Sequence, residues 1–193
     1  MTATTATELT MFEAVSDAIA NAISQATPAQ LAAPSPCAGW SARDVLNHTI
    51  GSANLFAASA RGEQQPFPDW SAMADCVGDD PAASYRRAAA GVIAAFGAPG
   101  VLDGTVAMPW GGTPGSFALN MVTSDHATHA WDLTRATGLT IDITPAAAET
   151  ALATAQASVS PELRAAGFYA AKQAARNDAS VLDQLAAFTG RTL

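Results

Sequence analysis

Apolar residues recur along most of the chain at every third or fourth position, and alternating stretches of the kind that form β-strands are few. This spacing matches the 3.6 residues of one helical turn. Alanine, the strongest helix former, dominates the composition. The pattern therefore predicts an all-α protein.

Start and stop signals divide this pattern into separate helices. Ser41 and Asp44 make a capping box, in which each side chain bonds a backbone N–H of the first turn. Asp80 followed by Pro81 is an N-cap with proline at the first helical position, and Gly97 ends the same helix. The predicted helices cover about 8–26, 41–61, 81–96 and 116–137, with a further one beginning at 144–145 and a last one over about 179–189.

The stretch 101–115 is rich in glycine and proline, which excludes a helix and predicts an extended segment over the mouth of the bundle. No repeat and no linker divides the chain. The expected architecture is a single domain over residues 1–193, a four-helix bundle with additional C-terminal helices.

Charge and cysteine content narrow the classes of function. The chain has 17 acidic and 9 basic residues, a net charge of −8, and no run of Lys or Arg, which argues against nucleic acid or an anionic membrane as partner. Cys37 and Cys76 form no CxxC pair. Without a leader pattern or a membrane-spanning stretch, we expect a soluble, cytoplasmic protein. Its alanine-rich helical faces are compatible with a homodimer.

The chain has three histidines, and their spacing suggests a site. Asp125 and His129 are one helical turn apart and point the same way, with His126 beside them and His48 on another helix. A carboxylate and two histidines from two helices can converge on one cation. The alternative is an Asp125–His129 ion pair facing a small polar pocket, and spacing does not separate the two.

The surroundings of His48 suggest an open site. Gly51, one turn further on, leaves space beside the ring, as an open coordination position requires. Asp44, one turn earlier, either accepts the second ring N–H of His48 or only caps the helix.

A helical wheel of residues 116–137 places Thr123 and Ser124 on the polar side, opposite the apolar face that carries the acid and the two histidines. His126 on that face has three interpretations: a third histidine ligand, a contact to substrate, or a hydrogen-bonded core residue. The spacing leaves all three open.

Several blocks of this sequence resemble a known family. Residues 34–48, PSPCAGWSARDVLNH, are similar to the block that opens the metal-binding domain of mycothiol-dependent maleylpyruvate isomerase, within the DinB-like superfamily. Residues 125–133, DHATHAWDL, are similar to its second block, in which an acid and a histidine four residues apart precede Trp-Asp. Residues 108–111 and 185–191 resemble an actinobacterial subgroup of uncharacterised metal-binding members, so the likeness covers nearly the whole chain.

The resemblance implies a DinB-like four-helix bundle and a divalent cation, typically zinc, held by His48, Asp125 and His129. Such a ligand set also suits Ni²⁺, Fe²⁺ and Mn²⁺. The isomerase has glutamate where this chain has Asp125, and it carries an extra C-terminal domain that we do not expect in a chain of this length. Both departures weaken a transfer of the isomerase activity itself.

Three protein ligands leave a coordination position open, and members of the superfamily are thought to place a low-molecular-weight thiol there. Metal binding would deprotonate such a thiol, whose free pKa is about 8.5. We therefore expect a mycothiol-type thiol transferase or isomerase acting on a small-molecule electrophile. One alternative is metal-activated water, with His126 or Asp132 as proton carrier. Another is a non-catalytic metal-binding or small-ligand-binding protein.

Four polar or aromatic residues are expected near the mouth of the pocket: Trp40, Arg43, Asn47 and Trp110. They suit contacts to a sugar-bearing thiol, and they suit equally well the anchoring of loops. Cys37 lies in a turn with no base predicted beside it, so it is not expected to be a nucleophile.

Overall fold

The computed structural model describes residues 3–70 and 72–193, with side chains described from Thr7 onward. Most of these residues are helical, and the strands form one small antiparallel hairpin. The elements are α1 (Ala3–Ile23), α2 (Pro28–Leu31), α3 (Ala42–Ala60), α4 (Pro81–Phe96), β1 (Thr105–Met108), β2 (Gly111–Pro114), α5 (Gly115–Thr137), α6 (Pro145–Ser158), α7 (Pro161–Ala165) and α8 (Val181–Phe188).

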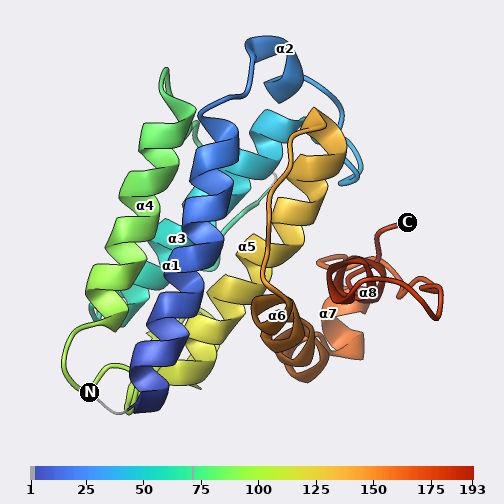
Figure 1. Ribbon diagram of the computed structural model, residues 1–193. Helices are drawn as coiled ribbons and strands as arrows, with labels where there is room; N and C mark the ends of the chain where they lie inside the picture. The colour runs from blue at the N-terminus through green and yellow to red at the C-terminus, as the bar shows by residue number, and fades with distance from the viewer. Residues whose placement is uncertain (1–2, 71) are drawn as a thin grey trace.

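Helices α1, α3, α4 and α5 form a bundle, in which α3 and α1 each pack against both α4 and α5 (Figure 1). The large side chains inside it are fully buried, among them Phe12 of α1, Leu46 of α3, Tyr85 of α4 and Leu119 of α5. These side chains recur at helical spacing, which is why the sequence shows the bundle. The predicted all-α, DinB-like fold is confirmed.

Helix starts agree with the capping signals. The Ser41 side chain accepts from the backbone N–H of Asp44, and the Asp44 side chain accepts from the backbone N–H of Ser41. At α4 the Asp80 side chain caps the helix by accepting from the backbone N–H of Ala83, without a reciprocal bond. The first helix was predicted over 8–26, but α1 spans Ala3–Ile23. It ends before residue 26, and Thr27 then forms its own capping box with Gln30 and begins the short helix α2.

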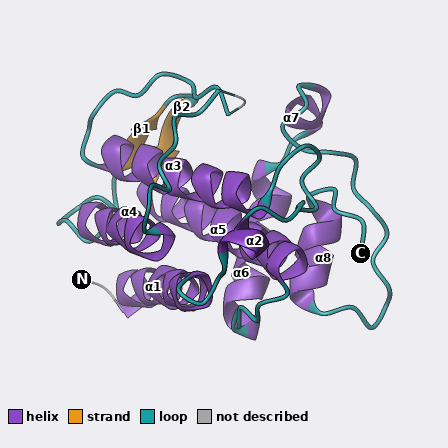
Figure 2. Ribbon diagram, turned by 90° about the horizontal axis from the view of Figure 1, so that it is seen from above, coloured by secondary structure: helices purple, strands orange, loops and turns teal. Residues whose placement is uncertain are grey.

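The segment predicted to be extended forms the β1–β2 hairpin, with Val106 paired to Thr113. This hairpin contacts α3 at one end of the bundle (Figure 2). At Gly115 the chain passes so close to Val101 that a Cβ atom would lie 1.9 Å from its carbonyl oxygen. Glycine therefore lets α5 begin directly beside the turn that precedes the hairpin.

The C-terminal helices cover the flank of α5 that the bundle leaves free, with α6 on α5 and α8 against both (Figure 1). The prediction that Thr123 and Ser124 lie on a polar face is wrong, because they are 1% and 6% exposed. Ser124 Oγ donates to the carbonyl oxygen of Ala151 on α6 at 2.8 Å. Hydroxyl groups bonded to backbone carbonyls tolerate this burial.

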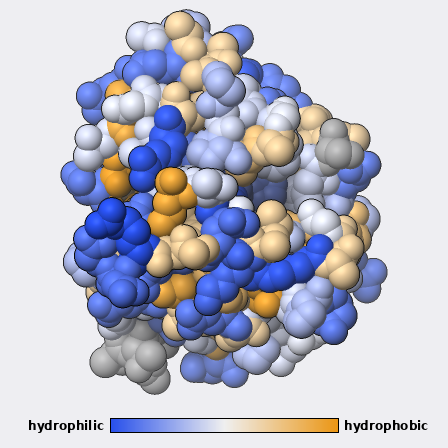
Figure 3. All heavy atoms as spheres, turned by 90° about the vertical axis from the view of Figure 1, so that its right-hand side faces the viewer, coloured by the Kyte–Doolittle hydropathy of each residue, from blue (hydrophilic) through white to orange (hydrophobic). Residues whose placement is uncertain are grey.

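The face formed on the side of α6–α8 is a mixture of polar and apolar residues, without one continuous apolar field (Figure 3). Among the described residues, no helix combines the length and the apolar character needed to cross a membrane.

Candidate metal centre

Helices α3 and α5 bring His48, Asp125 and His129, called the triad below, to one place. The Nε2 atoms of His48 and His129 lie 3.4 and 3.5 Å from Oδ1 of Asp125. Ligands about 2.1 Å from a tetrahedral zinc ion are separated from one another by about 3.4 Å. One ligand atom from each residue lies within 4.8 Å of the others, so the triad has the dimensions of a three-ligand site.

The triad holds one ionised carboxylate between two imidazoles. Burial opposes ionisation of Asp125, but His48 and His129 hold its pKa well below its usual range. Burial lowers the pKa of His48. For His129 burial acts in the same direction, yet the carboxylates of Asp125 and Asp132 raise its pKa well above the ordinary value.

Two buried polar atoms of the triad, Asp125 Oδ2 and His48 Nδ1, have no hydrogen-bond partner among the described residues. A buried carboxylate oxygen without a partner is costly in free energy. A cation beside this oxygen removes that cost, and two imidazoles with one carboxylate are a common ligand set for zinc. The donor set therefore fits a divalent metal ion.

Asp132 lies directly behind the triad and is fully buried. Its Oδ2 atom accepts a hydrogen bond from His129 Nδ1 at 2.9 Å, which leaves the His129 Nε2 atom directed at Asp125. Arg191 donates to both oxygens of Asp132, from Nε at 3.1 Å and from Nη2 at 2.7 Å. Burial would raise the pKa of Asp132, but His129 and Arg191 keep it below its ordinary value.

Cys37 lies closer to reactive groups than the sequence suggested. Its Sγ atom is 3.3 Å from Oδ2 of Asp132 and 3.4 Å from Nη2 of Arg191, and one ligand atom of His129 lies within 4.8 Å. The expectation that no base would stand beside Cys37 is therefore wrong, because residues far along the chain meet it in the fold. Arg191 already binds Asp132 there, so its positive charge opposes a second cation at this position.

His126 lies apart from the triad, in the core. It is fully buried, its ring packs 5.2 Å from that of Phe12, and its Nδ1 atom is 2.7 Å from the Tyr85 hydroxyl. Burial lowers the pKa of His126 to about 4, so the ring is neutral near pH 7. Of the three interpretations left open for His126, these contacts match the hydrogen-bonded core residue.

The open space expected beside His48 is filled. The ring of Trp70, from the loop that joins α3 to α4, lies 4.4 Å from the His48 ring. A Cβ atom added to Gly51 would lie 1.9 Å from the Met73 methyl group, so Gly51 accommodates the methionine of this loop. The α3–α4 loop therefore covers His48, whose side chain is 13% exposed.

Asp44 does not orient His48. Its Oδ2 atom accepts from the backbone N–H and the hydroxyl of Ser41, at 2.8 and 2.6 Å. The second of the two roles considered for Asp44, capping of the helix, is the one that the structure shows.

Two of the residues expected at the pocket mouth anchor the α3–α4 loop. Arg43 pairs with Asp75 at 2.9 Å, and the Asn47 amide donates to the carbonyl oxygen of Ala74 at 3.0 Å while accepting from the Cys76 N–H. These contacts hold the C-terminal half of the loop against α3.

The other two expected mouth residues are aromatic. The Trp40 ring lies 5.2 Å from the His48 ring, so Trp40 is part of the site's wall. Trp110 is 44% exposed and lies 6.5 Å from Phe67, whose ring is 5.5 Å from that of Phe168. Trp110 therefore belongs to an exposed aromatic cluster contributed by three separate segments.

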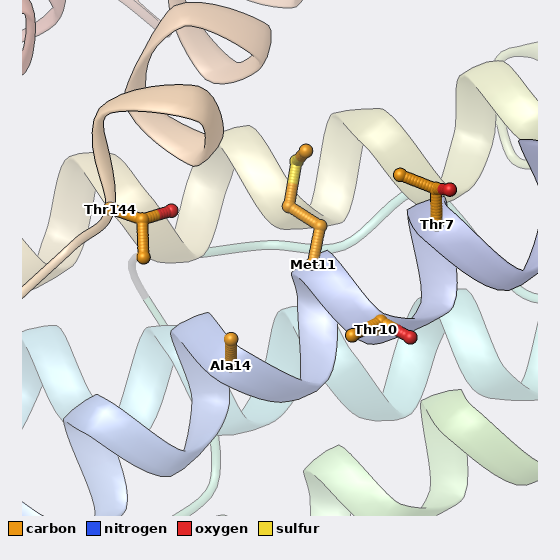
Figure 4. A pocket seen from close by; sticks show the side chains of 5 residues that line it. All are labelled: Thr7, Thr10, Met11, Ala14 and Thr144. Carbon is orange, nitrogen blue, oxygen red and sulfur yellow. The ribbon is translucent and has the colours of Figure 1, made fainter.

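A shallow surface pocket of about 400 Å³ lies elsewhere, where α1 approaches the start of α6 (Figure 4). Its lining consists of Thr7, Thr10, Met11, Ala14 and Thr144. None of these side chains is a strong metal ligand or a general base, so the pocket offers no competing site for the chemistry of the triad.

An all-α DinB-like bundle with two histidines and one aspartate converging from α3 and α5 defines a class of candidate metal-binding proteins. Residues 12–134 match the family described as mycothiol maleylpyruvate isomerase N-terminal domain. The chain belongs to this family.

Two relatives from Mycobacterium tuberculosis match over almost the whole chain. They are the uncharacterised proteins MT0763 of strain CDC 1551 / Oshkosh and Rv0738 of strain H37Rv. Each is 34% identical over 178 residues, which is 92% of this chain and 93% of the relative. No solved structure gave a significant match.

Proposed function

We propose that the protein binds a divalent metal ion, most simply Zn²⁺, through His48, Asp125 and His129, and that a small thiol of the mycothiol type occupies the remaining position. The observation that carries this proposal is the separation of 3.4 and 3.5 Å between the histidine Nε2 atoms and the aspartate oxygen. The family match to a mycothiol-dependent isomerase domain supports the thiol.

A divalent ion in this site would supply a Lewis acid that lowers the pKa of a bound thiol. The protein contributes two neutral imidazoles and one carboxylate, so the ion would retain about one positive charge that a thiolate neutralises. Such a thiolate would be a nucleophile for an electrophilic carbon. In a transfer, the new C–S bond would be kept, and the displaced electron pair would leave with a leaving group or take up the proton that the thiol gave up. In an isomerisation, rotation would occur about the single bond that the addition creates, and the C–S bond would then break to restore the double bond and the thiolate.

The contacts of the two candidate proton carriers favour thiol chemistry over activated water. His126 is fully buried, with Nδ1 bonded to the Tyr85 hydroxyl and Nε2 without a hydrogen-bond partner among the described residues. Asp132 accepts from His129, Arg191 and Cys37. A general acid or base must reach the reacting group and be free to exchange a proton there. Addition of a thiolate followed by its departure, as in an isomerisation, involves no net proton transfer.

The test is titration of the metal-free protein with Zn²⁺ and Co²⁺, for the wild type, Asp125→Asn and Asp142→Asn. Asp142 is an exposed carboxylate and serves as the matched control. We expect one equivalent to bind to the wild type and to Asp142→Asn, and much weaker binding to Asp125→Asn. Absence of stoichiometric binding to the wild type contradicts the metal site.

The thiol is tested separately on the Co²⁺-loaded protein. Mycothiol should add a sulfur-to-cobalt charge-transfer band and change the ligand-field spectrum. If metal binds but mycothiol leaves the spectrum unchanged, the thiol part of the proposal is wrong, and metal-activated water or a binding role without catalysis takes its place.

A further inference from the structure

Arg191 is a nearly buried cation at the C-terminal end of the chain, with a side chain that is 12% exposed. Its guanidinium contacts both oxygens of Asp132, as a two-pronged pair. A planar guanidinium in this geometry fixes the plane of the carboxylate as well as neutralising its charge. The pair is therefore more directional than a surface ion pair.

The carboxylate that Arg191 holds is the one that orients a triad residue. Oδ2 of Asp132 accepts from Arg191 at 2.7 Å and from His129 Nδ1 at 2.9 Å. Histidines that bind metals usually donate their second ring N–H to such an acceptor, which sets the tautomer and the ring orientation. The order of contacts is thus Arg191, Asp132, His129 and Asp125.

We propose that Arg191 is a positioning residue of the candidate metal centre, which fixes Asp132 so that His129 presents Nε2 toward Asp125. This inference rests on the proposed function, because it assigns Arg191 to the metal site. It also places part of the site outside residues 12–134, the region that matches the family.

The local structure explains how the C-terminal residues reach Asp132. The indole N–H of Trp131 on α5 donates to Asp183 at the start of α8, at 2.8 Å. Gly190 then adopts a φ of +103° and lies so close to Ala170 that a Cβ atom would be 3.0 Å from its backbone. Glycine permits this turn, after which the Arg191 N–H bonds the carbonyl oxygen of Ala186 at 2.8 Å.

The competing explanation is that Arg191 only anchors the C-terminal segment. Arg164 offers a matched control for this, because it also ties down that segment. Its guanidinium donates to the backbone carbonyl oxygens of Ala170 and, at 2.8 Å, of Phe188. None of its hydrogen bonds reaches Asp132, so Arg164→Gln loosens the segment without removing the carboxylate's partner.

The experiment compares wild type, Arg191→Gln, Arg191→Lys and Arg164→Gln by Co²⁺ and Zn²⁺ titration, with thermal unfolding recorded for each. We expect Arg191→Gln to weaken metal binding about 10- to 100-fold, the usual effect of losing such a partner, and to change the Co²⁺ ligand-field spectrum. Arg191→Lys keeps the charge and should recover part of the affinity. Arg164→Gln should lower thermal stability and leave metal affinity unchanged.

The proposal is overturned if Arg191→Gln binds metal as the wild type does, or if Arg164→Gln weakens binding equally. A second readout is needed in case Arg191→Gln folds poorly. It uses the metal-free protein, so it tests the positioning role of Arg191 separately from metal binding. In the metal-free protein labelled with ¹⁵N-histidine, Arg191→Lys should broaden or shift the His129 Nδ1–H resonance, whereas Arg164→Gln should not. If the wild type binds no metal, the proposed function fails, and this resonance alone decides whether Arg191 positions His129.

Discussion

Two histidines on α5, only three residues apart, have opposite environments. His126 packs between Phe12 of α1 and Tyr85 of α4, and its hydrogen bond is to a neutral hydroxyl. His129 lies between two carboxylates, with Asp125 at 3.5 Å and Asp132 at 2.9 Å. Both rings are buried, at 0% and 6% exposure, so burial by itself does not separate a core histidine from a candidate ligand.

The groups that contact each ring account for the difference between His126 and His129. Burial lowers the pKa of His126 to about 4, because Tyr85 offers no charge that would stabilise a protonated ring. The two carboxylates raise the pKa of His129 in spite of burial. The hydrogen bond of Nδ1 to Asp132 leaves Nε2 directed at Asp125. Positions three apart differ by about 60° around a helix, which is enough to point the two rings at different neighbours.

The largest expected effect is on stabilisation by metal. At a Zn²⁺ concentration of about 100 times Kd, the unfolding free energy of the wild type should rise by about 2.7 kcal/mol. His48→Ala removes a ligand and should abolish this rise, whereas Tyr85→Phe beside His126 should retain it. Thermal unfolding with and without Zn²⁺ measures both. If both variants lost the Zn²⁺-dependent stabilisation equally, the surroundings of His126 could not be distinguished from the metal centre.

Tyr85→Phe should itself destabilise the protein. It leaves the buried Nδ1 atom of His126 without its partner, at a cost of about 1–3 kcal/mol in unfolding free energy. Denaturant unfolding measures the loss, and Co²⁺ titration of the same variant should show wild-type affinity. A weakened affinity would mean that His126 contributes to the metal centre after all.

A smaller effect is expected from Gly51→Ala, which tests the cover over His48. The new Cβ atom would lie 1.9 Å from the Met73 methyl group and should displace the α3–α4 loop. We expect faster Zn²⁺ association and a red-shifted tryptophan emission, with a stability change within about 1 kcal/mol. Gly91→Ala on α4 is the control, because its Cβ atom would meet only Ala57 at an ordinary 3.8 Å. Identical association rates in the two variants would show that the loop does not limit access.

The smallest effect concerns Asp183, which ties α8 to α5 by accepting from the Trp131 indole N–H at 2.8 Å. Burial opposes its ionisation, but hydrogen bonds from Trp131 and Ser180 lower its pKa. A lowered carboxyl pKa adds stability that is present above the unfolded value near 4 and is lost as the pH falls through the lower, folded value. The loss in Asp183→Asn should stay below about 1 kcal/mol at pH 6, because the site is partly exposed. Its unfolding curve should approach that of the wild type as the pH falls toward 3, and a difference that persists unchanged would contradict the role of the charge.

Much of the fold was predictable from local signals. The capping box at Ser41, the Asp80–Pro81 start of α4 and the helical repeat of apolar residues each involve residues within one or two turns of one another. The spacing of Asp125 and His129 is equally local, so the pairing of an acid and a histidine on one helix face could be predicted.

Contacts between distant segments were not predictable in the same way. Thr123 and Ser124 looked solvent-exposed until α6 covered them, and the space beside Gly51 looked open until Met73 filled it. Cys37 had no predicted base, because Asp132 lies 95 positions away in the sequence. No local spacing reports such a contact.

The sequence alone therefore determined most of the helices, their apolar faces and the pairing of Asp125 with His129 on one helix face, because helical geometry relates residues that are close in the chain. The resemblance to the family, and not helical spacing, added His48 to this pair. Only the tertiary structure separated His126 from His129 and joined Arg191 to Asp132, since those outcomes depend on which distant segments pack together. A helix face presents a histidine, and the partners brought to it by the fold decide whether that histidine is part of the core or part of a candidate metal centre.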